Sequence, residues 1–246
     1  MKELLIALMT VTILSCGNNT SNNETDDTSA DQNTIGNSCL SELAEKNDIE
    51  KMISKEQVAS IVGISADKIA FEENKSSRAE YSTVRFEWEP EQERTMTMEM
   101  KVGDRTVSQT LPLQNGINVG NIDVIGNKKD QSALEYFNST YGPKTKEEKE
   151  QAIERIDRAQ ETSDQVNEKS AAVIKSMAGK LTSSKVDGIG NSAFGSVNNA
   201  KGMIYYNLKV LHGDTMFEIT TDVSEDSDED IRISKAIAQQ IIDNCN

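Results

Sequence analysis

Histidine and aromatic residues are scarce in this chain. It has one histidine, His212, and aromatic side chains make up only 4% of its 246 residues. A single imidazole removes most metal sites and any chemistry that needs two histidines, and the Gly-x-Ser-x-Gly elbow of serine hydrolases does not occur. The low aromatic content also argues against stacking platforms for sugars. We therefore predict no metal site, no cofactor and no catalytic residues, and we expect His212 to be a solvated turn residue.

Positive charge is scarce as well. The chain has 26 Lys and Arg against 41 Asp and Glu, and its formal net charge is -15 at pH 7. Nucleic acid and anionic lipid repel such a chain. We expect no nucleic-acid partner, and any attachment to a membrane must come from something other than a basic patch.

Long apolar runs are missing too. The apolar and small stretch Leu4–Leu14 follows Lys2 and precedes the polar residues 17–20. A membrane-spanning helix needs about 20 apolar residues, so this stretch is too short to span a bilayer. A short N-terminal region, an apolar central region and a small residue before the cleavage site are typical of a secretory signal peptide. We expect residues 1–15 to be a signal peptide that is removed.

The end of this stretch, Ile13-Leu14-Ser15-Cys16, resembles the lipobox of bacterial lipoproteins. The resemblance implies that Cys16 carries a thioether-linked diacylglycerol. It also implies that the lipoprotein signal peptidase cuts before Cys16, and that the new N-terminus receives an acyl chain such as palmitate. Each buried CH₂ contributes about 0.8 kcal/mol, so two or more chains hold a soluble body on a membrane. The implied location is the cell envelope, at the outer membrane, on its periplasmic or surface face. The alternative is an ordinary signal peptide with a cysteine at the cleavage point.

Residues 16–38 are predicted to be the lipidated cysteine and a flexible acidic tether, because they offer too few apolar side chains to form a core. Residues 39–246 are predicted to be a single α+β domain. The two remaining cysteines, Cys39 and Cys245, lie at its two ends. An even number in an exported chain favours a disulfide between them, and two separate buried thiols are the alternative. Closing a loop of some 200 residues stabilises a fold by about 5 kcal/mol in the chain-entropy model.

The first half of the body predicts a helix followed by antiparallel strands. A capping box at Ser54 begins a short helix. Apolar residues then alternate with polar ones over 84–88 and 96–102, which predicts two strands of one meander. A turn at Gly103-Asp104 leads to a third strand over 106–111. The methionines of the second strand suggest either a soft metal-ligand groove or a packed sheet face, and their period of two favours the packed face.

The second half predicts helices around a second meander. A helix is expected over 133–141, and a capping box at Thr145 begins a long central helix over 145–178. That helix would measure about 50 Å. It would either project from the body to bind a partner or lie across the sheet. Strands are predicted at 204–210 and 217–223, and a final helix follows the acidic run 225–230.

Two motifs in this half admit a functional and a structural interpretation. Gly188–Ala193 matches the letters of a dinucleotide-binding loop, but no helix pattern follows it, so we interpret it as a bend between strands. The acidic run from Asp222 to Asp230 suggests calcium, yet no register supplies the glycine and glutamate of an EF-hand. Acids at the N-terminus of the last helix, where its dipole favours negative charge, are the better interpretation.

The order of elements predicts an α+β fold, with an antiparallel sheet made from two meanders and covered by helices. Residues 186–194, the hairpin at Gly213-Asp214 and the terminal helix together resemble uncharacterised bacterial lipoproteins of the PsbP-like α/β/α type. The resemblance implies a binding or assembly module and supplies no catalytic residues. The leading hypothesis is a non-enzymatic, lipid-anchored envelope protein whose body binds a ligand or a partner protein, such as another protein of the envelope. The alternative is a carboxylate-dependent envelope hydrolase.

Overall fold

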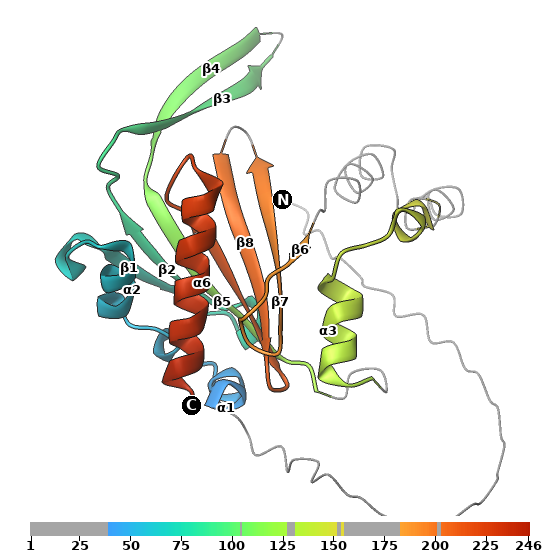
Figure 1. Ribbon diagram of the computed structural model, residues 1–246. Helices are drawn as coiled ribbons and strands as arrows, with labels where there is room; N and C mark the ends of the chain where they lie inside the picture. The colour runs from blue at the N-terminus through green and yellow to red at the C-terminus, as the bar shows by residue number, and fades with distance from the viewer. Residues whose placement is uncertain (1–38, 104, 127–130, 152–153, 155–182, 201–202) are drawn as a thin grey trace, which may run out of the picture. The chain divides into compact units, whose positions relative to one another are not determined.

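The computed structural model of the protein describes residues 39–103, 105–126, 131–151, 154, 183–200 and 203–246 (Figure 1). Contacts divide the chain into Met1–Thr34 and Ile35–Asn246, and every described residue belongs to the second unit. The predicted signal peptide, the tether with Cys16 and most of the predicted long central helix lie outside the described residues. The capping box that begins that helix is present, since the Glu148 N–H donates to Thr145 Oγ1 at 3.1 Å.

The centre of the body is an antiparallel sheet of seven strands in the order β1-β2-β5-β9-β8-β7-β6 (Figure 1). The first half of the chain contributes β1 (Ala70–Asn74), β2 (Thr83–Trp88) and β5 (Asn115–Val124). The second half contributes β6 (Ser184–Lys185), β7 (Ser192–Ala200), β8 (Met203–His212) and β9 (Thr215–Asp222). Pairing of β5 with β9 joins the two sets. The predicted α+β fold with a sheet from two meanders is confirmed.

Helices pack on both faces of this sheet. On one face lie α1 (Cys39–Lys46), α2 (Lys55–Val62) and the long C-terminal α6 (Ser227–Asn244), and on the other lies α3 (Ala133–Tyr141). Short 3₁₀ turns complete the first half: η1 (Ile49–Lys51), η2 (Ala66–Lys68) and η3 (Ala79–Tyr81). The predicted covering of the sheet by helices is confirmed.

The two faces have separate apolar cores because successive side chains of a strand point to opposite sides. Beneath α6, Phe86, Leu208 and Phe217 are fully buried together with Ile237 and Ile241 of the helix. Beneath α3 a smaller core holds Ile125, Phe137, Phe194, Leu211 and Met216. Each such side chain stabilises the fold by roughly 1.5–3 kcal/mol, so the larger core fixes α6 to the sheet.

Side chains at the helix starts match the sequence patterns. Ser54 Oγ accepts a hydrogen bond from the Gln57 N–H at 3.2 Å, and Gln57 Oε1 accepts one from the Ser54 N–H. These two bonds confirm the predicted capping box of α2. Ser132 forms the same box at α3. Asp226 caps α6, whose first turn carries Asp228 and two further acids. The interpretation of the acidic run as the start of the last helix is confirmed.

The strands β3 (Arg94–Val102) and β4 (Arg105–Leu113) form a separate two-stranded ribbon, here called the arm (Figure 1). The two predicted strands exist and pair with each other, and Asp104 of the predicted turn lies outside the described residues. The predicted pairing of 84–88 with 96–102 is wrong. Strand β2 pairs instead with β1 and β5. The arm is therefore an insertion between two neighbouring strands of the main sheet, which alternation within each strand does not reveal.

The prediction that the methionines form a packed sheet face is also wrong. Met96 and Met98 are half-buried, and Met100 is 42% exposed. Among the strands that the structure describes, only β4 pairs with β3, and a two-stranded ribbon has no second layer to bury its side chains unless another element covers it. Period two identified the strand correctly but did not show whether anything covers it.

Strand β5 lies in a stretch for which the sequence pattern predicts no element. It contains Gly116 and Gly120 and an irregularity after Gly120, where Asn121 has a positive φ of 50°. Gly120 itself has a φ of 156°, and a Cβ there would lie 2.3 Å from the Ser82 carbonyl oxygen. Glycine is required at this position because the neighbouring backbone approaches so closely.

Candidate functional site

A cleft of about 680 Å³ opens where the arm leaves the sheet. Its walls come from the end of α2, the loop between β2 and β3, and the loop between β9 and α6. The only tryptophan of the chain, Trp88, lies in it. We call it the acidic cleft, because five of its lining residues are acids: Glu91, Glu93, Glu225, Asp226 and Glu229.

Arg94 lines the acidic cleft, and its side chain is only 9% exposed. Its Nη1 donates to Asn115 Oδ1 at 2.9 Å and to the Asp222 carbonyl oxygen at 3.3 Å. Its Nη2 forms an ion pair with the Asp222 carboxylate and reaches the Ser224 carbonyl oxygen at 3.5 Å. Arg94 thus ties the first residue of the arm to β5 and β9. Its Nε has no hydrogen-bond partner within the described part of the chain.

Asp230 lies behind this cleft in the first turn of α6 and is fully buried. Its Oδ1 accepts the Val223 N–H at 3.0 Å, while its Oδ2 has no partner among the described residues. The pKa of Asp230 is raised to about 7, mainly by burial and to a smaller extent by the Asp222 carboxylate. The Val223 N–H and the Arg94 cation oppose the shift. The physical reason is that an ionised carboxylate loses its hydration inside the protein.

The pair of Asp222 and Asp230 has the features of an acid and a base held in different environments. Asp222 is ion-paired with Arg94, while Asp230 has the raised pKa. However, Asp230 has no exposed surface and is not among the residues that line the acidic cleft. A general acid must come within hydrogen-bond reach of its substrate. In this structure, therefore, Asp230 holds the loop between β9 and α6 and is not placed to transfer a proton to a ligand.

A second polar group lies on the α3 face of the sheet. Lys209 forms an ion pair with Glu218, and Asn121 and Asn207 donate to the same carboxylate. Burial alone would raise the pKa of Glu218, but the Lys209 charge and these hydrogen bonds outweigh it and the pKa is lowered. Lys209 Nζ also lies 5.2 Å from the centre of the Tyr141 ring.

Cavities of about 280 Å³ and 500 Å³ flank the pair formed by Lys209 and Tyr141. Glu218 is held ionised by its partners, so it is a poor proton donor at neutral pH. Because Lys209, Glu218 and their amide partners already satisfy one another, this group stabilises a polar sheet face. It offers no group that is prepared for catalysis.

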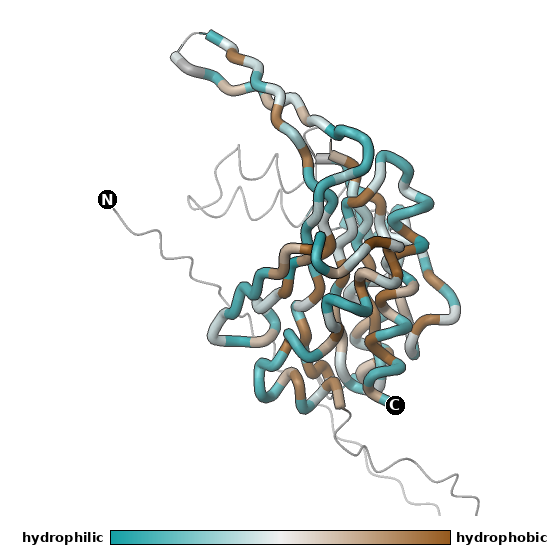
Figure 2. Tube along the Cα trace, turned by 90° about the vertical axis from the view of Figure 1, so that its left-hand side faces the viewer, coloured by the Kyte–Doolittle hydropathy of each residue, from teal (hydrophilic) through white to brown (hydrophobic). Residues whose placement is uncertain are grey.

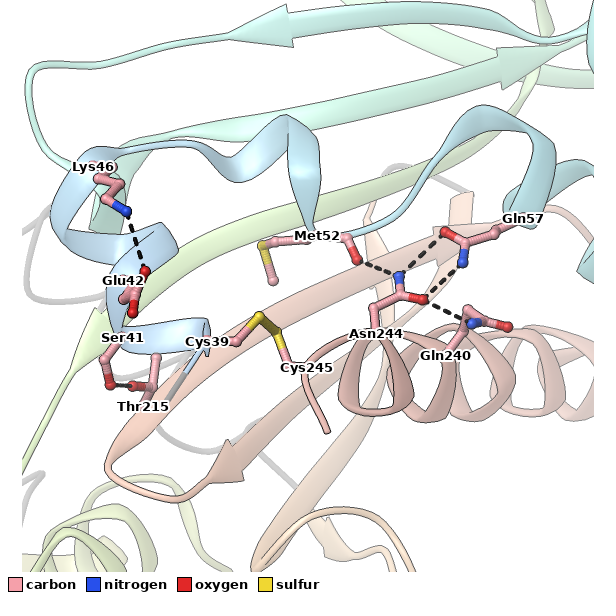
Figure 3. Close-up of a disulfide and its surroundings, with 10 residues drawn as sticks. All are labelled: Cys39, Ser41, Glu42, Lys46, Met52, Gln57, Thr215, Gln240, Asn244 and Cys245. Carbon is pink, nitrogen blue, oxygen red and sulfur yellow. Dashed lines mark hydrogen bonds and ion pairs between the residues drawn. A yellow bond between two sulfur atoms is a disulfide. The ribbon is translucent and has the colours of Figure 1, made fainter. Parts of the chain in front are cut away.

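The structure joins Cys39 and Cys245 by a disulfide, with 5.1 Å between their Cα atoms and a sequence separation of 206 (Figure 3). Cys39 begins α1 and Cys245 follows α6. Beside the bond, Asn244 donates to the Met52 carbonyl oxygen at 3.0 Å and exchanges hydrogen bonds with Gln57. This is the pairing that the sequence predicts, and it connects the two ends of the described body.

The other residues that the sequence singles out lie apart from the acidic cleft. Cys16 is outside the described residues. Gly188–Ala193 forms the bend that leads into β7, with positive φ at Gly188 and Gly190, so the interpretation as a bend is confirmed. The predicted turn at Gly213-Asp214 is present, but His212 is the half-buried last residue of β8 and does not belong to the turn.

Sequence reasoning missed Arg94, Asp222 and Asp230 as a group. Arg94 and Asp222 are 128 positions apart, and no local pattern connects them. Among the described residues, no group of three or more His, Cys, Asp or Glu side chains is placed to hold a metal ion. In the same residues, no helix is both long and apolar enough to cross a membrane.

Comparison with protein-family models, with curated proteins and with solved structures finds no match for this chain.

Proposed function

We propose that this protein is a lipid-anchored protein of the cell envelope whose acidic body binds a partner and carries out no catalysis. In this proposal, Cys16 carries the lipid, residues 1–15 are removed, and residues 17–38 connect the lipid to the body. The anchor places the body at the outer membrane, on its periplasmic or surface face.

The observation that carries the proposal is the lipobox-like Ile13-Leu14-Ser15-Cys16 in a chain whose other two cysteines pair. Structural disulfides persist in oxidising compartments and are rare in the cytosol. A bond between Cys39 and Cys245 therefore favours an exported body, and it leaves Cys16 as the remaining cysteine to take a lipid.

The geometry of the acidic cleft supports binding over catalysis. Its buried cation, Arg94, is engaged by Asp222, and the carboxyl with the strongly raised pKa, Asp230, is enclosed. The accessible groups of the cleft are acids around Trp88 and the base of the arm. Such a surface recognises a complementary charge and provides no nucleophile with an adjacent base.

Intact-mass analysis of the membrane fraction tests the anchor directly, using wild type and Cys16→Ser. We expect the wild-type chain to begin at Cys16 and to carry the added mass of diacylglycerol and an acyl chain. The Cys16→Ser chain should lack that mass and leave the membrane fraction. Reduction should add the mass of one pair of hydrogen atoms to each form. An unmodified full-length wild-type chain in the cytosol would refute the proposal.

A carboxylate-dependent envelope hydrolase is the second candidate, and the raised pKa of Asp230 beside Asp222 is the observation that favours it. The discriminating variant is Asp230→Asn, which keeps the shape of the side chain and removes the ionisable group. If the wild-type chain hydrolyses an envelope ester or glycoside and Asp230→Asn does not, the enzyme hypothesis replaces ours. Asp228→Asn, at an exposed position of the same helix turn, is the matched control.

A further inference from the structure

The acidic cleft continues into an apolar row along the arm. Residues directly opposite each other in an antiparallel ribbon share a face, and every second residue of a strand returns to that face. Arg94, which lines the cleft, therefore shares one side of the arm with Met96, Met98 and Met100, here called the methionine row. The cross-strand partners on that side are Leu113, Leu111, Gln109 and Val107.

This side of the arm is mainly apolar, apart from Gln109 and Arg105 on β4, and it is incompletely covered. Met100 is 42% exposed and Val107 is 45% exposed, while Met96 and Met98 are half-buried. The opposite side carries Thr95, Thr97, Glu99 and Lys101 on β3 and Thr106, Ser108, Thr110 and Pro112 on β4. Figure 2 shows hydrophobic and hydrophilic positions alternating along the arm. Exposed apolar rows next to polar rims mark interaction surfaces, and methionine adapts its shape to varied partners.

The charge of the cleft indicates the chemistry of the occupant. Glu91, Glu93 and Glu225 are exposed at the cleft, while Arg94 is neutralised by Asp222. Anionic lipid and nucleic acid are repelled by such a wall. A second copy of the chain would bring the same acids and a further formal charge of -15. The complementary partner is therefore basic at one end and apolar along one side.

The size of the surface is that of a peptide segment. Strand β3 has nine residues and at about 3.3 Å per residue measures about 30 Å, the length of a helix of about 20 residues. Because two-stranded ribbons twist, the methionine row winds around the arm, and Met96 lies nearest to the cleft.

We propose that the acidic cleft and the methionine row together bind a basic amphipathic segment of a partner protein. Lysine and arginine side chains of the segment meet the cleft acids, and its apolar face packs on the methionines, in the manner of an amphipathic helix on a groove. The inference rests on the proposed function as a binding module, and it names the chemistry of the partner.

The test is titration of the full chain carrying Cys16→Ser with a synthetic helical peptide of about 20 leucines and lysines, free of tryptophan. Trp88 fluorescence and isothermal titration calorimetry measure binding. A peptide of the same pattern with glutamate in place of lysine, and a scrambled leucine-lysine peptide, are the comparisons. We expect only the helical leucine-lysine peptide to bind, with an affinity that falls as salt is raised.

Two variants separate the charged and apolar parts of the surface. Glu91→Gln with Glu93→Gln and Glu225→Gln should together weaken binding about ten-fold, since each exposed ion pair contributes only weakly. Its control neutralises three exposed acids elsewhere: Glu45, Glu72 and Glu147. Met98→Thr with Met100→Thr should also weaken binding about ten-fold while favouring the strand. Thr97→Ser with Thr110→Ser changes the opposite side and is its control.

Several outcomes would overturn the inference. Equal losses in the acid variant and its control would show attraction to net charge alone. Unchanged binding in the methionine variant would remove the arm from the surface. A wild-type chain that sediments as a dimer, with a monomeric methionine variant, would identify a second copy as the occupant. The lipid anchor is tested separately by the mass of the wild-type chain. A wild-type chain without lipid would refute the anchor, and peptide binding by the Cys16→Ser chain would still support the surface.

Discussion

Replacing Asp230 by asparagine should change the pH dependence of folding. Burial raises the pKa of Asp230 to about 7 in the folded protein, whereas an aspartate of the unfolded chain has a pKa of about 3.9. Between these values the folded state binds more protons than the unfolded state. The contribution of the protonated carboxyl to stability is therefore fully present below about pH 4 and is lost as pH rises through about 7.

The size of the effect follows from the shift. Three pKa units correspond to about 4 kcal/mol, and water and side chains that relax around the charge lower this figure, so we expect between about 2 and about 4 kcal/mol. Asparagine imitates the protonated form. Its side-chain oxygen can accept the Val223 N–H as Oδ1 does, and its NH₂ group takes the position of Oδ2, which has no partner among the described residues. The two proteins should be about equally stable at pH 4, and Asp230→Asn should be the more stable at pH 8.

Urea denaturation at a series of pH values, followed by Trp88 fluorescence, measures the difference. Comparing wild type with one variant cancels the titration of the other carboxyls, and Asp228→Asn controls for the loss of a charge at the helix start. Parallel pH profiles for wild type and Asp230→Asn would refute the reasoning. A profile in which Asp228→Asn behaves like Asp230→Asn would assign the effect to repulsion among the acids of this helix start and not to burial.

Two further predictions concern the stability of the body. Replacing Cys39 and Cys245 by alanine should lower the free energy of unfolding by about 5 kcal/mol in the chain-entropy model. A urea midpoint that is the same with and without reductant would contradict this value. Gly120→Ala should destabilise the protein by 1–3 kcal/mol or more, because its Cβ would lie 2.3 Å from the Ser82 carbonyl oxygen. A Cβ at Gly116, in the same strand, would have no atom within 4 Å, so Gly116→Ala should lower the free energy of unfolding far less in the same urea titration.

The acidic run of the last helix shows how one motif acquires two roles. Asp226 and Asp228 lie at the surface, where the positive end of the helix dipole favours them, as the sequence predicts. Asp230 belongs to the same run, but the turn of the helix carries it inward beneath the loop between β9 and α6. Helical periodicity indicates which residues share a side of the helix, but not which backbone groups that side meets.

The arm shows the same limit for strands. Alternation over 96–102 identified β3, and the turn predicted at Gly103-Asp104 anticipated the pairing of β3 with β4 that the structure shows. Strand β3 does not pair with β2, because β5 pairs with β2 instead. The alternating pattern did not predict β5, because its glycines and its bulge interrupt that pattern. The missed pairing matters for function, because the methionine row beside the acidic cleft is only partly covered.

By itself, the sequence determined the features that depend on neighbours a few positions apart: the caps at Ser54 and Thr145, the alternation of the strands and the start of the last helix. Once the lipobox resemblance assigned Cys16 to the lipid, the sequence also favoured a disulfide between Cys39 and Cys245 over two separate thiols. Only the tertiary structure decided which strands pair, which side of the arm stays open, and how Arg94 meets Asp222 across 128 positions. The reason is that the burial of side chains and the pairing of strands depend on contacts between segments that are distant in the sequence. Local sequence patterns do not contain information about those contacts.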